Sequence, residues 1–304
     1  MAQTKQAVAG AAGSGIPGLH MQPSFLRSVA RFARRKPLGA ISAAVILVLI
    51  ICAVFAPWIA PNDPLAYSPG RQLQPPGSEF PLGSDEIGRD VLSRIVYGAR
   101  VSLQVGIIAV AIGTTLGATL GIVSGYFGGK LDLLIQRIVD AMMAFPGLIL
   151  ALAVVAALGP AIHNVMVAIG ILVAPGTARV VRSAVLTVKE IPFIEAAHAL
   201  GVPTDRILVR HILPNVTAPL IVLATVQLGA AIITEASLSF LGLGTPPPAP
   251  SWGSMLGGTA RFRLEQAPWL LWAPAISISL VVLSFNLLGD ALRDVLDPRL
   301  RGGR

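Results

Sequence analysis

Apolar residues in this chain form long runs without any charged residue, and short polar segments separate these runs. The charge-free runs cover residues 38–62, 101–129, 141–178, 212–234 and 267–289. A helix needs about 20 apolar residues to cross the hydrocarbon core of a bilayer. Because every run is at least that long, the pattern predicts membrane-spanning helices.

The run over 141–178 is too long for one crossing, and Gly159 with Pro160 interrupts it. The sequence therefore predicts two helices here, one that begins near Leu131 and one over residues 163–188. The next run is expected to continue past its first acidic residue to Leu241. Six transmembrane helices and an all-α fold follow from this pattern.

The composition also indicates a polytopic membrane protein. Of the 304 residues, 54% are hydrophobic and 12% are charged, and the mean hydropathy is +0.74. A typical soluble domain is about 25% charged, so an ordinary soluble globule, a disordered chain and a coiled coil are excluded. The single cysteine, Cys52, excludes a disulfide framework and a cysteine-based metal site.

Basic residues gather at the ends of the apolar runs and predict the orientation of the helices. The tail before the first run holds six Lys and Arg residues and no acidic residue. If this tail is cytoplasmic, 17 of the 23 basic residues lie on the cytoplasmic side. Since cytoplasmic loops carry an excess of Lys and Arg, both termini are expected in the cytoplasm.

The same pattern predicts how the chain is divided. The first apolar run is longer than the core of a signal peptide, about 7–15 residues, and lacks a small-residue cleavage site, so we expect an uncleaved anchor. The expected parts are a basic cytoplasmic tail with a disordered start (1–36), a first transmembrane helix (37–60), an extracytoplasmic loop (61–98), a five-helix core (99–292) with a cytoplasmic loop at 189–213, and a cytoplasmic tail (293–304).

No catalytic motif accompanies the apolar runs. The sequence contains neither His-Glu-x-x-His nor Gly-x-Ser-x-Gly, and segment 125–130 lacks the glycine spacing and the Ser or Thr of a phosphate loop. The four histidines are scattered, and no motif supports a hydrolase built on Ser237 and the distant His163. We therefore expect no catalytic residue, no metal site and no nucleotide hydrolysis by this chain.

A glycine stands at every fourth position of the second apolar run, at Gly113, Gly117, Gly121 and Gly125. These positions share one helix face, where the missing side chains let another helix approach closely. Packing within this subunit is favoured over a subunit interface.

The polar segment 189–213 predicts a short helix outside the bilayer. Pro192 fits the first turn of a helix, Glu195 complements the helix dipole near its start, and Gly201 can adopt the left-handed conformation that ends it. The small alanine side chains between them leave a slim surface that fits a groove of another protein. The alternative is a polar connector without a partner.

Glu195-Ala196-Ala197, followed by Gly201 and by His211-Ile-Leu-Pro214, resembles the EAA loop of ABC importer permeases, although that family commonly has an aliphatic residue in place of His211. The resemblance implies that this loop forms a coupling helix that docks on a cytoplasmic ATPase. On this basis the coupling residues are expected to be Phe193, Ile194, Glu195, Ala196, Ala197, Leu200 and Gly201, of which Phe193, Ile194 and Leu200 would be apolar anchors.

Three further segments, 83–100, 235–244 and 286–298, are similar to segments of the permeases in dipeptide, oligopeptide and nickel importers. The last of them, together with the short first loop, resembles the C-type subunit of the permease pair. The resemblance implies a type I ABC importer permease fold in the bacterial cytoplasmic membrane. The implied partners are a homologous B-type permease, two ATPases that bind ATP and Mg, an extracytoplasmic binding protein and membrane lipid, with no cofactor in this chain and no nucleic acid. Peptides are the expected substrate, with glutathione and nickel as alternatives.

Two acidic residues are candidates for the transport pathway or its gate. Glu235 is the one acid deep in an expected span, where an ionisable group is costly and should face the pathway or a partner group. It could bind a peptide amino group, but a structural hydrogen bond is favoured. Asp140, near the cytoplasmic end of the third span, is similarly ambiguous. A stand-alone channel or secondary transporter would require charged or polar residues in several spans. Since Glu235 is essentially the one such residue found, this alternative is disfavoured.

The outer loop from residue 242 to 267 contains three consecutive prolines and Trp252, and Trp269 follows it. Proline restricts the backbone, and tryptophan favours the membrane interface. We expect this loop to be a stiff lid that faces the binding protein, together with the loop that precedes the second span.

Overall fold

A computed structural model describes residues 32–258, 262–263 and 265–296, and the described chain contains helices and no strands. Contacts divide the chain into two units, residues 1–37 and residues 38–304. The long helices are α2 (Pro37–Val54), α4 (Val91–Phe127), α7 (Ile162–Lys189), α10 (Leu213–Phe240) and α12 (Trp269–Leu296). The shorter elements are α3 (Ala56–Ile59), α5 (Gly129–Met143), α6 (Gly147–Leu158), α8 (Pro192–Ala199), α9 (Thr204–Ile207), the π-helix η1 (Leu208–Ile212) and α11 (Trp252–Leu256).

The five long helices are each long and apolar enough to cross a membrane within the described chain, and α5 with α6 can form a sixth crossing. This pair is bent by 94° at a short break, so the third span is not one continuous helix. Pro146 explains the break, because proline has no N–H and disfavours helical backbone at the preceding residue.

Several helix ends differ from the boundaries expected from the apolar runs. The helix expected at 37–60 ends at Val54, and α3 follows it after a short interruption. The polar segment expected to be a loop up to residue 98 contains the first two turns of α4, which begins at Val91. Asp90 caps this start by accepting hydrogen bonds from the backbone N–H groups of Leu92 and Ser93. Helix α12 continues to Leu296, beyond the expected end at 292; the expected tail at 297–304 and the disordered start at 1–31 lie outside the described residues.

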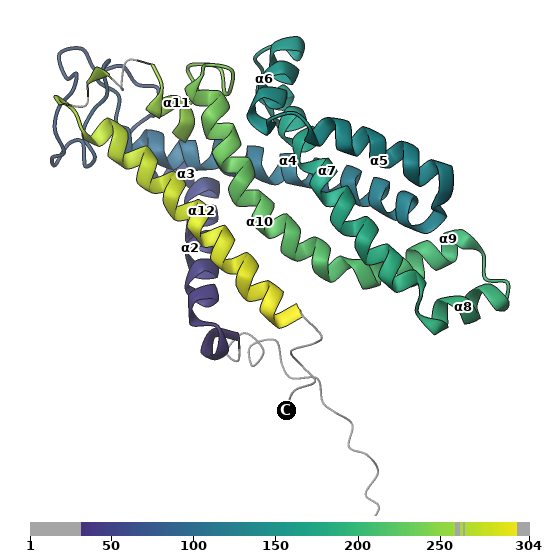
Figure 1. Ribbon diagram of the computed structural model, residues 1–304. Helices are drawn as coiled ribbons and strands as arrows, with labels where there is room; N and C mark the ends of the chain where they lie inside the picture. The colour runs from purple at the N-terminus through teal and green to yellow at the C-terminus, as the bar shows by residue number, and fades with distance from the viewer. Residues whose placement is uncertain (1–31, 259–261, 264, 297–304) are drawn as a thin grey trace, which may run out of the picture. The chain divides into compact units, whose positions relative to one another are not determined.

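Helices α4 and α7 lie side by side along the glycine face of α4 (Figure 1). A Cβ added at Gly113 would lie 2.6 Å from the carbonyl oxygen of Gly170 in α7, and Gly117 and Gly121 approach the α7 backbone at least as closely. The expectation that these glycines pack within the subunit is confirmed. On the other side of α4, buried residues of α2, α10 and α12 form a second apolar cluster.

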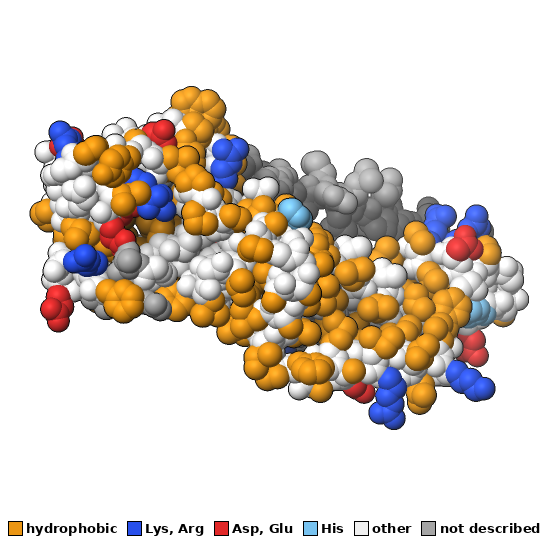
Figure 2. Space-filling view, turned by 90° about the horizontal axis from the view of Figure 1, so that it is seen from above, with side chains coloured by type: hydrophobic (Ala, Val, Ile, Leu, Met, Phe, Trp, Pro, Cys, Tyr) orange, Lys and Arg blue, Asp and Glu red, His pale blue; other side chains and the backbone are white. Residues whose placement is uncertain are grey.

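Charged side chains gather toward the two ends of the face shown in Figure 2, and hydrophobic side chains cover the stretch between them. Exposed apolar side chains occur on α2, α4, α5, α10 and α12. In a protein that crosses the membrane, such side chains contact lipid or partner subunits, because apolar surface is stable there. Figure 1 shows α8 and α9 near one of these ends and α11 near the other.

Candidate functional site

Helix α8 is a short, well-terminated helix that follows α7. Pro192 lies in its first turn, as expected. The helix ends at Gly201, whose φ is +72°; its N–H donates to the carbonyl of His198 at 2.9 Å, and the N–H of Val202 donates to the carbonyl of Ala197 at 3.0 Å. These two bonds form a Schellman motif, which favours glycine at the left-handed position. The expectation that Gly201 ends the helix in this conformation is confirmed.

One face of α8 is buried against the rest of the chain. Ile194 is 1% exposed and Ala197 is also buried; both lie in an apolar cluster with residues of α4, α7 and η1, among them Val185 and Ile212. The expectation that Ile194 is an anchor for an external ATPase is therefore wrong, because its side chain is enclosed by its own chain. Ile194 instead fixes the position of α8 on α7.

The opposite face of α8 is exposed. Phe193 is 42% exposed and Leu200 is 83% exposed, and Glu195, Ala196 and Gly201 are exposed beside them. The Phe193 ring also contacts the imidazole of His211, with ring centroids 5.9 Å apart. Five of the seven expected coupling residues thus share an accessible surface that combines apolar side chains, small side chains and one carboxylate.

Tyr126, at the end of α4, connects α8 to two spans. Its hydroxyl lies 3.2 Å from Nε2 of His198, and the two rings stack. Its backbone carbonyl accepts a hydrogen bond of 2.7 Å from Nζ of Lys189, at the end of α7. The sequence analysis missed this buried tyrosine, and nothing in its sequence context marks a contact 72 residues away.

Two ion pairs connect α5 with α7. Asp132 accepts two hydrogen bonds from the Arg182 guanidinium, at 2.7 and 2.6 Å, and both side chains are largely shielded. Asp140 pairs with Arg179 at 2.7 Å, and both of these side chains are half exposed. The pathway candidate Asp140 therefore has a partner inside the chain, and its proposed role in the pathway stays a prediction.

Glu235 is fully buried within α10, near the end that leads to the outer loop. The hydroxyl of Ser102 in α4 donates to one carboxylate oxygen at 3.0 Å, and the hydroxyl of Ser239 donates to the other at 2.7 Å. The carboxylate thus connects α4 with α10 through side chains of the same chain. A role for Glu235 in the pathway or gate stays a prediction.

The outer loop between α10 and α12 folds into the protein more deeply than expected. Trp252 in α11 is 1% exposed, and its indole N–H donates to the carbonyl of Ile95 at 3.0 Å. The Trp252 side chain fills the space beside Gly98 in α4, and the expected role of this loop as a lid facing the binding protein stays a prediction. The indole N–H of Trp269 likewise donates to the carbonyl of Ser84 at 3.1 Å.

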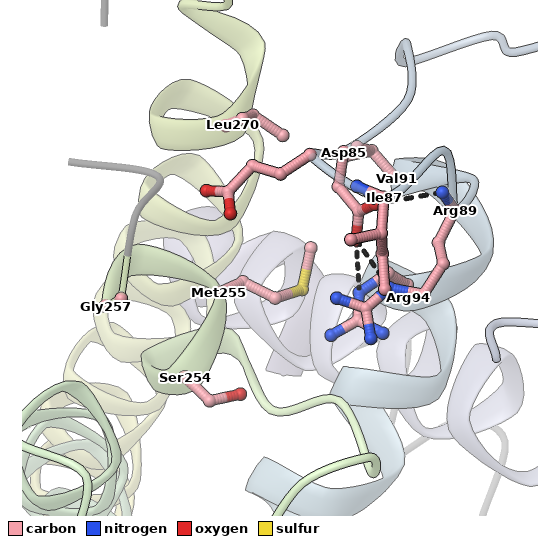
Figure 3. A pocket seen from close by; sticks show the side chains of 11 residues that line it. Asp85, Ile87, Arg89, Val91, Arg94, Ser254, Met255, Gly257 and Leu270 are labelled. Atoms are coloured by element: carbon pink, nitrogen blue, oxygen red, sulfur yellow. Dashed lines mark hydrogen bonds and ion pairs between the residues drawn. The ribbon is translucent and has the colours of Figure 1, made fainter. Parts of the chain in front are cut away.

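Asp85 organises the loop before α4, as Figure 3 shows. Its carboxylate lies 2.6 Å from Nε of Arg89 and 3.6 Å from Nε of Arg94. These residues line a cavity of about 170 Å³ together with α11 and the start of α12. Burial raises the pKa of Glu86, which also lines the cavity, and the neighbouring Asp85 raises it further. The polar segment before α4 is therefore ordered by ion pairs and hydrogen bonds within the chain.

Two family profiles match this chain. The profile described as "Binding-protein-dependent transport system inner membrane component" matches residues 117–302, and "N-terminal TM domain of oligopeptide transport permease C" matches residues 24–76. The chain is 45% identical over 268 residues to the dipeptide transport system permease protein DppC of Alkalihalophilus pseudofirmus, with 88% of each chain covered. It is 46% identical over 270 residues to the glutathione transport system permease protein GsiD of Escherichia coli, with 88% of this chain and 89% of the relative covered.

A similar fold occurs in a solved structure, a chain of the MetNI methionine ABC transporter in an inward-facing conformation. The TM-score is 0.53, and the match covers 67% of this chain and 96% of the MetNI chain. At 19% sequence identity this likeness concerns the fold alone.

Proposed function

The chain belongs to the family of binding-protein-dependent transport system inner membrane components, and from this premise we propose that it is the C-type permease of an ATP-driven importer of peptides. It has the ABC importer permease fold and is a multi-pass protein of the bacterial inner membrane. We propose no enzymatic activity and no cofactor for this chain, since in such a transporter separate subunits bind ATP and Mg and hydrolyse the nucleotide.

The exposed face of α8 carries the proposal of an ATPase partner. Phe193 and Leu200 present apolar surface beside Glu195, while Ile194 holds the helix on α7 from the other side. This arrangement suits a helix that docks in a groove of another protein and passes its movement to the spans behind it. We propose that α8 is the coupling helix, and that a B-type permease, two ATPases and an extracytoplasmic binding protein complete the importer.

Transport then depends on a difference in affinity between two states. ATP can drive the permease outward only if the nucleotide-bound ATPases bind the outward state more tightly than the inward state. A shift from about 1:99 to 99:1 requires a preference of about 10⁴-fold. Helix α8 transmits this preference to α4 through the contact of His198 with Tyr126, whose carbonyl is bound by Lys189 of α7, and to α7 directly through the buried Ile194.

Peptides are the proposed substrate because the similarity to the dipeptide permease extends over 88% of both chains. The comparable similarity to a glutathione permease makes glutathione, itself a small peptide, the second candidate. Nickel remains the third candidate.

Purification of the native complex in mild detergent, followed by mass spectrometry and by uptake of radiolabelled dipeptides and glutathione, tests this proposal. The native chain should bring down an ATPase and a second permease and should support uptake. Glu195→Lys should release the ATPase, whereas Glu265→Lys, which reverses an exposed charge in the outer loop, should retain it. A chain that purifies alone in several detergents would refute the proposed assembly.

A further inference from the structure

The break between α5 and α6 opens onto a cavity of about 360 Å³. Phe145 and Gly147 line the cavity at the break, and the remaining lining comes from α5, α6, α7 and α10. Non-helical backbone within a membrane span is tolerated where it is buried in protein or lines a cavity. In secondary transporters, interrupted helices form substrate sites, and we apply the same physical argument to this permease. The volume lies within the range of small-molecule sites, about 300–1,000 Å³.

Gln227 and Thr234 are the polar residues of this lining, and the Thr234 hydroxyl donates to the carbonyl of Ala230 at 2.9 Å. Gln227 stands at the middle of α10, 14 residues from Leu213 and 13 from Phe240, so it lies about 20 Å from either helix end. Its amide pairs with the Thr177 hydroxyl of α7, with Nε2 3.1 Å and Oε1 3.3 Å from that oxygen. An amide offers two N–H donors and a carbonyl oxygen with two lone pairs, so Thr177 leaves donor and acceptor capacity for a ligand.

The rest of the lining is suited to varied side chains. Met142 and Met143 lie beside Phe145 on the wall formed by α5 and the break. Methionine is flexible and polarisable and adapts to ligands of different shape. A wall of this kind, opposite one neutral amide, can accept different side chains while it recognises the peptide bond that all peptides share.

We propose that this cavity is a subsite of the translocation pathway, in which the Gln227 amide exchanges hydrogen bonds with a backbone amide of the transported peptide. The inference rests on the proposed function and adds a site to it. Membrane lipid is the less suitable occupant, because a polar amide at mid-span faces the cavity and lipid tails cannot hydrogen-bond with it. The site lies apart from Glu235 and Asp140, the two acidic candidates expected from the sequence; neither lines the cavity.

Three variants in the complete importer, reconstituted in proteoliposomes, separate a pathway role from a packing role. Gln227→Leu removes the amide, while Thr177 keeps its hydrogen bond to the carbonyl of Val173. Thr177→Val breaks the same contact between α7 and α10 but leaves the amide in the cavity. Asn286→Leu removes an amide from another span that does not line the cavity.

We expect Gln227→Leu to lower kcat/KM for dipeptide uptake about tenfold, the value of one good hydrogen bond. Thr177→Val and Asn286→Leu should change it less than about twofold. If Gln227→Leu and Thr177→Val cause equal losses, Gln227 acts in helix packing and the inference fails. If the native importer transports peptides and Gln227→Leu transports them equally well, the inference also fails, while the proposed function stands.

Cysteine labelling gives a measurement that does not depend on the rate. In a Cys52→Ser background, Ala230→Cys lies on the cavity wall, whereas Ile233→Cys on the same helix is exposed outside it. Peptide-loaded binding protein and ATP should slow maleimide labelling of Ala230→Cys and leave Ile233→Cys unchanged. Equal labelling with and without peptide at both positions would refute the subsite.

Discussion

Gly201→Ala places a Cβ on the residue that ends α8 with a φ of +72°. An added Cβ would meet no atom within 4 Å, so the substitution causes no clash and acts on the backbone alone. The left-handed conformation costs an L-residue with a Cβ about 1–2 kcal/mol relative to glycine. The two terminal hydrogen bonds of the Schellman motif require that conformation, so Gly201→Ala destabilises both of them.

A cost of about 1–2 kcal/mol lowers the population of α8 with both terminal hydrogen bonds formed about 5- to 30-fold relative to conformations in which its C-terminus is frayed. Helix α10 offers a matched control at Gly242. Its φ is +81°, its added Cβ would also be free of contacts, and the same two bonds end the helix: Gly242 N–H to the carbonyl of Ser239 and Leu243 N–H to the carbonyl of Leu238. Gly242→Ala therefore imposes a similar backbone cost at the other end of the protein.

The assays are co-purification of the ATPase and peptide-stimulated ATP hydrolysis by the complete importer. Gly201→Ala should lower both about fivefold or more, whereas Gly242→Ala should retain ATPase binding despite a similar loss of thermal stability. Gly201→Asn should restore part of the function, since asparagine tolerates the left-handed conformation better than alanine does. Equal coupling defects in Gly201→Ala and Gly242→Ala, or normal coupling in Gly201→Ala, would refute the reasoning.

Further predictions concern the two faces of α8, the buried glutamate and the outer loop. Ile194→Ala should destabilise the protein by about 2–5 kcal/mol in thermal unfolding, because it leaves a cavity in the apolar cluster behind α8. Phe193→Ala should leave the stability unchanged and weaken ATPase binding, because its side chain is exposed. Equal losses of stability in both variants would contradict this. Glu235→Gln should keep the native folding yield. Glu235→Leu should lower the free energy of unfolding by about 1–3 kcal/mol, and with it the yield, since it removes the acceptor of two buried hydroxyls. Equal yields of both variants would contradict this prediction. Burial raises the pKa of Glu86 above its ordinary 4.5, so the folded state holds that proton more tightly than the unfolded state. Stability should therefore fall as the pH rises from about 4.5 through the raised pKa of the folded state. Glu86→Gln should reduce this fall in Tm, and an unchanged pH dependence would exclude the effect.

The sequence by itself determined the features that depend on local rules. The lengths of the apolar runs and the interruption at Gly159 and Pro160 predicted six crossings, since a bilayer sets the length of a helix; five long helices are present in the described chain, and α5 with α6 can form the sixth. Gly201 and Pro192 marked the ends of α8 because each restricts or permits a backbone conformation by its own chemistry. The four-residue glycine spacing also indicated a close helix contact, which α7 provides. Pro146 is a similar local signal for the break in the third span, but the sequence analysis divides this apolar run only at Gly159 and Pro160.

Only the tertiary structure decided which side chains face inward and which partners they have. Phe193 and Ile194 are adjacent and both apolar, yet one is exposed and the other buried, because the packing of α8 on α7 selects the face. Glu235 accepts a hydrogen bond from a serine hydroxyl 133 residues away, and Gln227 lines a cavity together with residues of α5, α6 and α7. Contacts between distant segments depend on how the helices pack, and the helical repeat of one segment carries no information about the neighbour it will meet.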